Sequence, residues 1–165
     1  MPPVIAVLVN VDPEGPVPPE YSRLFAEEIV PLVDAEFRTL RAAEGRASIG
    51  AGWYAYPALY VAFDHPGLIG KVGVQSLFML DSMRIPLEEI ISVAAEQPLD
   101  FYVEWGAYDL QNPQENWDAR QFTAEFAEFM RARGYVVAGG EVPDGTGWDS
   151  WRNRNDVVLE ALFAR

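Results

Sequence analysis

The sequence predicts an α/β fold, a three-layer αβα sandwich built around a mostly parallel sheet of about five strands. Short apolar runs alternate with longer amphipathic stretches along the whole chain, which is the pattern of strands alternating with covering helices. The run Val4–Val11 is continuous and rich in β-branched residues, which is typical of a parallel strand buried on both faces. The chain has 165 residues, with no linker or internal repeat, so we expect one domain covering residues 1–165.

The elements follow from these patterns in chain order. The run Val4–Val11 (VIAVLVNV) is predicted to be the first buried strand, and a proline-rich loop, DPEGPVPPE, follows it. A helix is expected from Pro19 to Leu40, bent or interrupted at Pro31. The remaining strands are predicted at Ala47–Ala51, Lys71–Gln75, Phe101–Trp105 and Tyr135–Glu141, and the remaining helices at Pro57–Asp64, Pro86–Glu96, Asn116–Arg133 and Trp151–Arg165.

Composition excludes several classes of partner and cofactor. A formal charge of −13 repels phosphate backbones and anionic lipids, so we expect neither nucleic acid nor a membrane surface as partner. The chain has no cysteine and one histidine, so thiolate metal sites are excluded and no metal or other cofactor is implied. No signal peptide or long apolar run is seen, which favours a soluble, cytoplasmic protein.

The stretch RASIGAGWYAYPALY, residues 46–60, has the form of a nucleophile elbow without a nucleophile. A strand, a tight small-residue turn and a helix are the elements by which an α/β-hydrolase presents its serine. Here the presenting position is Gly52. Glycine relieves the backbone strain of such a turn, because it adopts positive φ freely.

Five motifs in order resemble esterases of the esterase D and enterochelin-esterase-like family, a branch of the α/β-hydrolases. They are GAGWYAYPALY, HPGLIGKV, GVQSL, EWGAYD and DGTGWDSWR, and together they span nearly the whole chain. The resemblance implies a nucleophile position at Gly52, an acid position at Asp109 and a base position at Thr146. Acyl transfer needs a hydroxyl activated by imidazole, so only the acid of this triad is left.

No other residue is a clear substitute for the missing groups. Ser48 lies within the elbow strand and Ser76 follows the next strand, so we interpret both as ordinary strand or loop serines. His65 lies in the turn after the elbow helix, at the opposite end of the sheet, and is interpreted as a structural turn residue. Asp109 is expected to cap a loop or accept backbone N–H bonds. Asp144, Asp149 and Glu141 leave a weak cation site conceivable, although their spacing matches no known motif.

An aromatic cluster supports a binding hypothesis. Aromatic residues gather in loops expected at one end of the sheet, where their rings could stack on a small aromatic or sugar-like ligand. Filling of the vacated pocket as core and a protein interface are the alternatives, and Trp151 is expected to pack structurally. The candidate ligand-binding residues are Trp53, Tyr54, Tyr56, Tyr108 and Trp148.

The family's first three strands and its oxyanion-loop segment have no counterpart here. Either Val4–Val11 pairs with the elbow strand, giving a flavodoxin-like sheet, or another segment or a second chain fills the space. Because an open strand edge invites association, we expect a homodimer or a monomer that covers this edge.

These observations together predict an esterase-like domain that is catalytically inactive and has a binding or structural role. The alternatives are a weak or complemented carboxylic-ester hydrolase, and a truncated or redesigned esterase scaffold.

Overall fold

The computed structural model describes residues 2–10 and 18–164. Val11, Arg165 and the predicted proline-rich loop up to residue 17 lie outside the described residues. The last three residues of that predicted loop, 18–20, already belong to the first helix.

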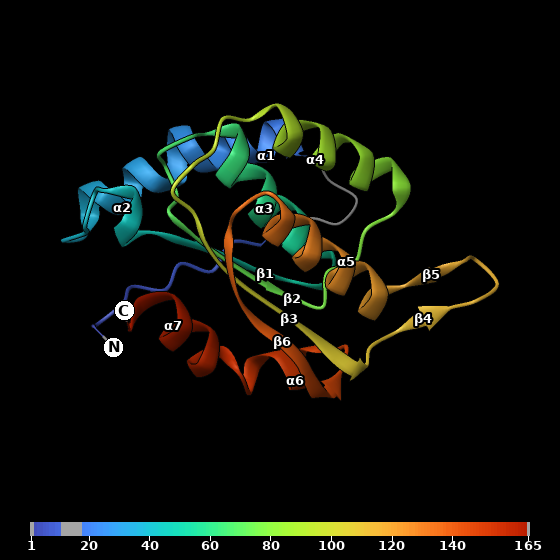
Figure 1. The fold of residues 1–165 in the computed structure, drawn as a ribbon. Helices are drawn as coiled ribbons and strands as arrows, with labels where there is room; N and C mark the ends of the chain where they lie inside the picture. The colour runs from blue at the N-terminus through green and yellow to red at the C-terminus, as the bar shows by residue number, and fades with distance from the viewer. Residues whose placement is uncertain (1, 11–17, 165) are drawn as a thin grey trace.

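The main sheet has four parallel strands in the order β1-β2-β3-β6 (Figure 1). The strands are β1 (Ala47–Ala51), β2 (Lys71–Gln75), β3 (Asp100–Tyr108) and β6 (Val136–Gly145). Strands β1 and β2 have the predicted bounds, whereas β3 and β6 continue beyond their predicted ends. The α/β fold class is therefore confirmed, with four strands in the sheet.

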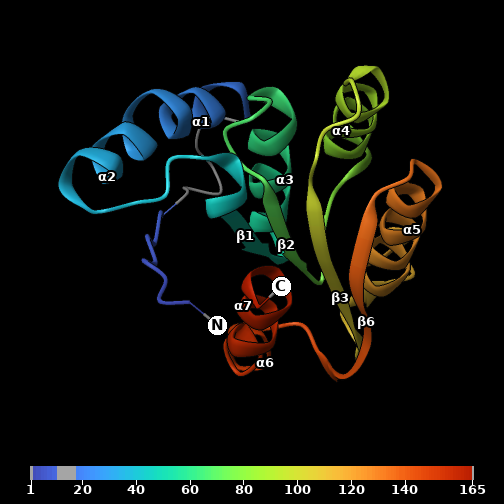
Figure 2. The ribbon, with the colours of Figure 1, turned by 60° about the vertical axis from the view of Figure 1, so that its left-hand side comes forward.

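Helices cover both faces of the sheet (Figures 1 and 2). Figure 1 shows α6 (Trp148–Arg152) and α7 (Asn155–Phe163) below the sheet and the other helices above it. The larger core lies between the sheet and the upper helices and contains Phe101 and Val103. Tyr102, between them in β3, packs on the opposite face with Val158 and Leu162 of α7. The upper helices are α1 (Pro18–Leu24), α2 (Val30–Glu36), α3 (Ala55–Asp64), α4 (Asp81–Val93) and α5 (Ala119–Ala132).

The predicted first strand does not form. Residues 4–10 have no regular secondary structure and are mostly exposed, so the predicted strand over Val4–Val11 is wrong for all its described residues. The segment has strand-forming residues, but a strand also needs a hydrogen-bonded neighbour, and this segment has none in the sheet. The flavodoxin-like alternative, in which it pairs with β1, is therefore not what this structure has.

The predicted long N-terminal helix is interrupted, as expected around Pro31. A π-helical turn, η1 (Phe25–Ile29), separates α1 from α2, and Pro31 stands in the first turn of α2, where its missing N–H costs least. Two short 3₁₀ turns, η2 (Ala43–Gly45) and η3 (Gly52–Tyr54), flank β1.

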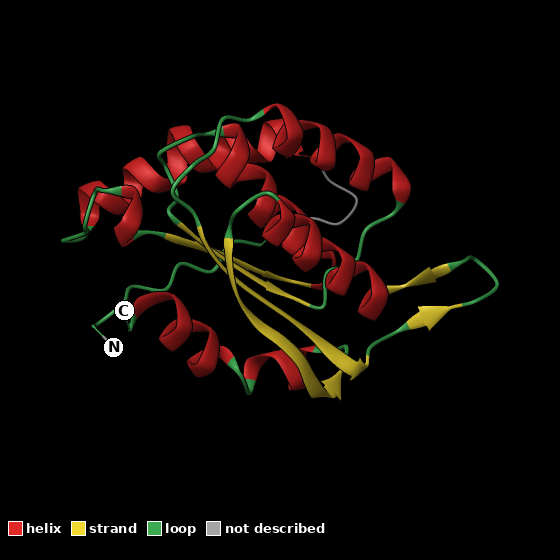
Figure 3. Cartoon of the chain, viewed as in Figure 1, coloured by secondary structure: helices red, strands yellow, loops and turns green. Residues whose placement is uncertain are grey.

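Other helix boundaries differ from the prediction for local reasons. Helix α4 begins at Asp81 and contains Pro86, which the prediction placed at its start. Helix α5 begins only at Ala119, because β4 (Gln111–Asn112) and β5 (Trp117–Asp118) form a small antiparallel hairpin before it (Figure 3). Asp118 caps α5 by accepting the Gln121 N–H at 3.0 Å.

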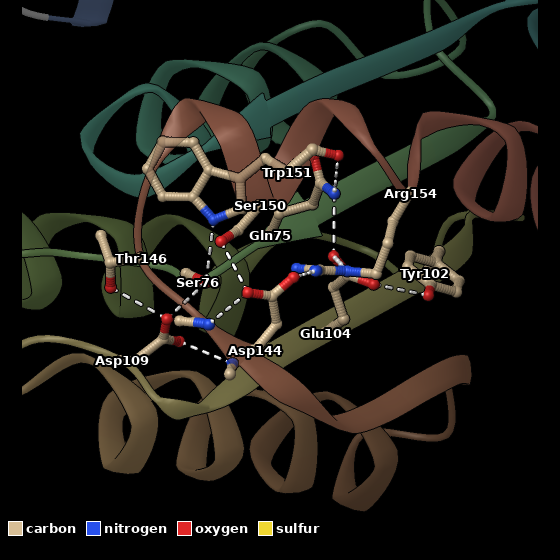
Figure 4. A network of polar contacts seen from close by, with 12 residues as sticks. Gln75, Ser76, Tyr102, Glu104, Asp109, Asp144, Thr146, Ser150, Trp151 and Arg154 are labelled. Carbon is tan, nitrogen blue, oxygen red and sulfur yellow. Dashed lines mark hydrogen bonds and ion pairs between the residues drawn. The ribbon is translucent and has the colours of Figure 1, made fainter.

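The predicted last helix is divided between α6 and α7 by residues 153–154. At this break Arg154 turns inward and its Nε donates to Oε1 of Glu104, a fully buried residue of β3, at 2.9 Å (Figure 4). Nη1 of Arg154 pairs with Asp144 near the end of β6. One guanidinium therefore ties the C-terminal helices to two neighbouring strands.

The buried Glu104 carboxylate has further donors. Gln75 Nε2 donates to Oε1 at 2.8 Å, and the Tyr102 hydroxyl donates to Oε2 at 2.7 Å. Burial raises the pKa of Tyr102, and the bond to Glu104 raises it further. Gln75 also donates to the carbonyl of Trp151 at 3.3 Å, so this network holds α6 against β2.

Replacing Arg154 tests how much this network contributes to stability. Arg154→Ala leaves the Glu104 charge buried without its cation, so we expect the free energy of unfolding to fall by about 3–5 kcal/mol. Arg152→Ala is the matched control. Arg152 pairs with Asp149, and their side chains are 56% and 87% exposed. Loss of this exposed ion pair is expected to cost less than about 1 kcal/mol. Urea unfolding of both variants measures the difference, and equal losses would contradict this role for Arg154.

A second prediction concerns acid stability. Hydrogen bonds from Ser150 and the Gly145 N–H, with the charge of Arg154, hold the pKa of Asp144 below its ordinary value of 3.8. A carboxyl whose pKa is lower when folded stabilises the protein above its unfolded pKa, and this contribution disappears as the pH falls through the folded value. Asp144→Asn should therefore lower stability at neutral pH and shrink the loss seen on acidification below about pH 4.

Urea unfolding of Asp144→Asn at neutral and acid pH gives this comparison. The control is Asp149→Asn, which removes a carboxylate that is 87% exposed and is expected to change the stability little. An Asp144→Asn profile parallel to that of the wild type would show that Asp144 does not carry the effect.

Candidate functional site

Four residues meet at one edge of the sheet because each comes directly after a parallel strand. Gly52 follows β1 and Ser76 follows β2, while Asp109 follows β3 and Thr146 follows β6. The carboxyl ends of parallel strands share one edge, which is where open α/β sheets place their ligands. The structure thus brings together the three positions inferred from the sequence and adds Ser76.

The turn from β1 into α3 is too tight for side chains at two positions. A Cβ on Gly50 would lie 2.2 Å from the carbonyl oxygen of Tyr54, so the strand and the following helix touch through their backbones. Gly52 has a φ of +58°, the left-handed region that favours glycine. A Cβ on Gly52 would also lie 2.9 Å from the indole ring of Trp151. The elbow therefore has its compact geometry, with an indole where a nucleophile's side chain would begin.

Asp109 is the centre of a hydrogen-bonded cluster (Figure 4). Its Oδ1 accepts from Thr146 Oγ1 at 2.9 Å and from Ser76 Oγ at 3.0 Å, and its Oδ2 accepts the Gly106 N–H at 2.8 Å. Thr146 Oγ1 in turn accepts the Leu110 N–H at 2.9 Å. Thr146 thus occupies the place beside the acid with a hydroxyl, which cannot act as a base near neutral pH.

Ser76, interpreted from the sequence as an ordinary strand or loop serine, belongs to the site, so that interpretation was wrong. It is 1% exposed and adopts a φ of +49°, which is uncommon for a residue with a side chain. Its hydroxyl donates to Asp109 and accepts the indole N–H of Trp151 at 3.0 Å. Its position directly after a strand, at the same edge as the elbow, was the available signal. We name Ser76, Asp109, Thr146 and the Trp151 N–H the polar floor.

A hollow of about 210 Å³ opens beside Ser76, Thr146 and Trp151 of this floor. Its walls are largely aromatic: the Phe78 ring stands 4.8 Å from Trp117, edge to face, and 5.5 Å from Trp53, centroid to centroid. Trp117 belongs to the β4–β5 hairpin, so the hairpin forms one wall. The lining residues are Gly52, Trp53, Ser76, Phe78, Leu110, Trp117, Ala119, Thr146 and Trp151.

The aromatic residues singled out from the sequence are distributed unevenly around this hollow. Trp53 lines it. Tyr56 is buried in the main core, and Tyr54, Tyr108 and Trp148 are 43%, 79% and 63% exposed and do not line it. Phe78, in the segment between β2 and α4, and Trp117, in β5 of the hairpin, take part instead, and neither stood out in the sequence.

The remaining candidates lie away from the polar floor or have structural roles. His65 caps the far end of α3, with its Nε2 3.4 Å from Asp64 Oδ2. Ser48 is a buried residue within β1. Of the acidic residues considered for a cation, Asp144 pairs with Arg154, and Glu141 and Asp149 form exposed ion pairs with arginines. Within the described residues, no group of three or more acidic or histidine side chains is placed to hold a metal ion.

A helix that crosses a membrane must be long and apolar. In the part of the chain that the structure describes, every helix is too short or too polar to cross a bilayer.

Comparisons with known proteins agree with this architecture. The chain is 36% identical over 67 residues to the uncharacterized protein YjcH of Bacillus subtilis (strain 168). The matched stretch covers 41% of this chain and 28% of that protein. The enterochelin esterase of Shigella flexneri is similar in structure, with a TM-score of 0.72, 17% identity, and coverage of 88% of this chain and 37% of that one. A ferulic acid esterase has a TM-score of 0.68 at 16% identity, covering 86% of this chain and 60% of that one.

The chain thus spans less than two thirds of each of these three proteins. The two structural likenesses show the fold, an α/β-hydrolase-type arrangement. The family model described as "Putative esterase" matches residues 2–154, nearly the whole chain. By this match the chain belongs to that esterase family.

Proposed function

We propose that this chain is a catalytically inactive esterase-like domain of the esterase D and enterochelin-esterase-like type, and that its vacated active site binds a small aromatic ring. The observation that carries the proposal is the elbow. Gly52 supplies no attacking atom, and the ring of Trp151 occupies the space next to it. Thr146 holds the place beside Asp109 where a triad needs an imidazole.

Ser76 supports a competing function, that of a weak carboxylic-ester hydrolase. It is a buried hydroxyl at positive φ, hydrogen-bonded to a carboxylate beside the hollow. A carboxylate alone is a poor base for a serine hydroxyl, since its ordinary pKa is near 4. The indole N–H of Trp151 also occupies the Ser76 oxygen that would have to attack. We therefore favour the inactive domain.

The polar floor favours an apolar ring over a sugar. The Ser76 and Thr146 hydroxyls both donate to Asp109, and their oxygens accept N–H groups, so the hydrogen-bonding capacity of the floor is largely used within the protein. A sugar buried there would lose hydrogen bonds to water without gaining equivalents. An aromatic ring needs only the walls, and apolar cavities of about 150 Å³ are large enough for benzene. The proteins with similar folds include esterases named for the aromatic compounds ferulic acid and enterobactin.

The inactivity is tested with short-chain p-nitrophenyl esters and a serine-directed phosphonate, followed by intact-mass measurement. We expect no turnover above buffer and no adduct, because none of the described hydroxyls has an imidazole beside it. Ser76→Ala is the matched variant. Turnover with a stoichiometric adduct in the wild type, lost in Ser76→Ala, would establish the hydrolase and contradict the proposal.

Ligand binding is tested by calorimetry with p-cresol, benzoate and glucose. We expect p-cresol to bind, and benzoate and glucose to bind more weakly or not at all, since the floor offers no cation and few free donors. Trp117→Ala should weaken p-cresol binding about threefold to tenfold, because an aromatic contact contributes about 0.5–1.5 kcal/mol. Trp148→Ala removes an exposed indole outside the hollow and serves as the control. Equal affinities in the two variants would place the ligand elsewhere.

A further inference from the structure

The outer edge of β1 is open in the described part of the chain. Strand β1 pairs with β2 along its whole length, from Ala47 opposite Lys71 to Ala51 opposite Gln75, and no described strand pairs with its other side. Ile49, at the centre of β1, is 40% exposed. An open edge presents a row of backbone N–H and C=O groups to any chain that can add a strand, so proteins usually cover or charge such edges.

The segment Val4–Asn10 is a strand-like stretch without a strand partner in the sheet. It is rich in β-branched and other apolar residues, yet it is exposed and pairs with nothing in the sheet: Ile5 is 49%, Val7 47% and Leu8 93% exposed. Within one copy, the described residues therefore include a strand-like segment and a strand edge that are both unpaired. Both lie on the same flank, which Figure 2 shows on the side of the sheet away from β6.

Exposed apolar side chains are frequent in the N-terminal part of the chain. Half of the large apolar side chains that stand exposed in the described structure belong to residues 4–49, less than a third of the chain. Such a concentration marks an interaction surface more often than a free one. Its members are Val4, Ile5, Val7, Leu8, Leu24, Leu32, Phe37, Leu40 and Ile49, and we name it the N-terminal flank.

Charge indicates which partner fits. The whole chain has a formal charge of −13, but neither Pro2–Asn10 (PPVIAVLVN) nor β1 (ASIGA) contains a charged residue. Two copies that meet along these stretches would place no carboxylate against another. Both halves of the contact are present in every copy, so an exchange between two copies is reciprocal and closes into a symmetric dimer.

We propose that the N-terminal flank is a homodimer interface in which segment Val4–Asn10 of each copy adds as a strand to the open edge of β1 in the other. Added strands satisfy the edge's backbone groups, and exposed apolar side chains of the segment and of Ile49 are buried in the same contact. The acidic surfaces outside the contact repel each other, so dimerisation strengthens as salt rises and screens this repulsion.

The absence of cysteine in the chain makes a crosslinking test direct. Ile49→Cys chains are mixed with Val7→Cys or Leu8→Cys chains of different mass under mild oxidation. Successive strand residues point to opposite faces, so one of these two lies on the same face as residue 49. Cross-strand neighbours are close enough for a disulfide, so we expect a covalent heterodimer. Val93→Cys, an 84% exposed valine at the end of α4, is the control and should not link to Ile49→Cys.

Light scattering and sedimentation of the wild type give the independent readout. We expect a dimer whose dissociation constant falls with added salt, and a monomer for Val7→Lys but not for Val93→Lys. A monomeric wild type at high micromolar concentration and high salt would overturn the proposal. So would a Val7→Cys/Ile49→Cys double variant that forms its disulfide only within one chain, because the segment would then cover its own edge.

Discussion

The close contact between the end of β1 and the start of α3 determines what the site can be. No side chain fits at Gly50, where the strand meets the Tyr54 carbonyl, and the turn places Gly52 in the left-handed region. These requirements belong to the turn and are independent of any reaction. An elbow can therefore remain intact after its nucleophile has gone, since a glycine at its tip relieves strain of about 1–3 kcal/mol that a serine would have to bear. In the proposed inactive domain, the geometry of a hydrolase elbow is kept without its chemistry.

The polar floor shows how the groups beside the elbow are hydrogen-bonded without an imidazole. A buried carboxylate such as Asp109 needs hydrogen-bond donors whether or not it orients an imidazole. Here Asp109 accepts hydrogen bonds from Ser76, Thr146 and the Gly106 N–H. The Trp151 indole N–H donates to the Ser76 hydroxyl oxygen. A triad needs one member left free to move a proton. This cluster instead uses its hydroxyl protons in fixed hydrogen bonds, and it joins three strand ends to α6.

Much of the fold could be predicted from the sequence, but less of the site. Ala47–Ala51 and Lys71–Gln75 were predicted with their observed bounds, because each is a short run around β-branched residues that lies between turn residues. Val4–Val11 has the same pattern and is no strand in its described part, since pairing depends on a neighbour that the segment itself does not encode. Ser76 was set aside for a similar reason. Its hydrogen bonds depend on how the strands are aligned and on the Trp151 indole of α6, which is 75 residues away in the sequence. The break at Arg154 depends on the buried Glu104, a partner 50 residues earlier in the chain.

The sequential order of the strands has a consequence for how the protein folds. Each strand of the main sheet pairs with the one that precedes it in the sheet order β1-β2-β3-β6, so the sheet can grow in the order in which the ribosome releases the chain. Elbow geometry can form early, from β1 and α3 alone. The cluster around Asp109 must wait for β6 and α6, which supply Thr146 and Trp151. During synthesis the elbow edge of the sheet therefore stays exposed to water and incomplete until β6 and α6 dock.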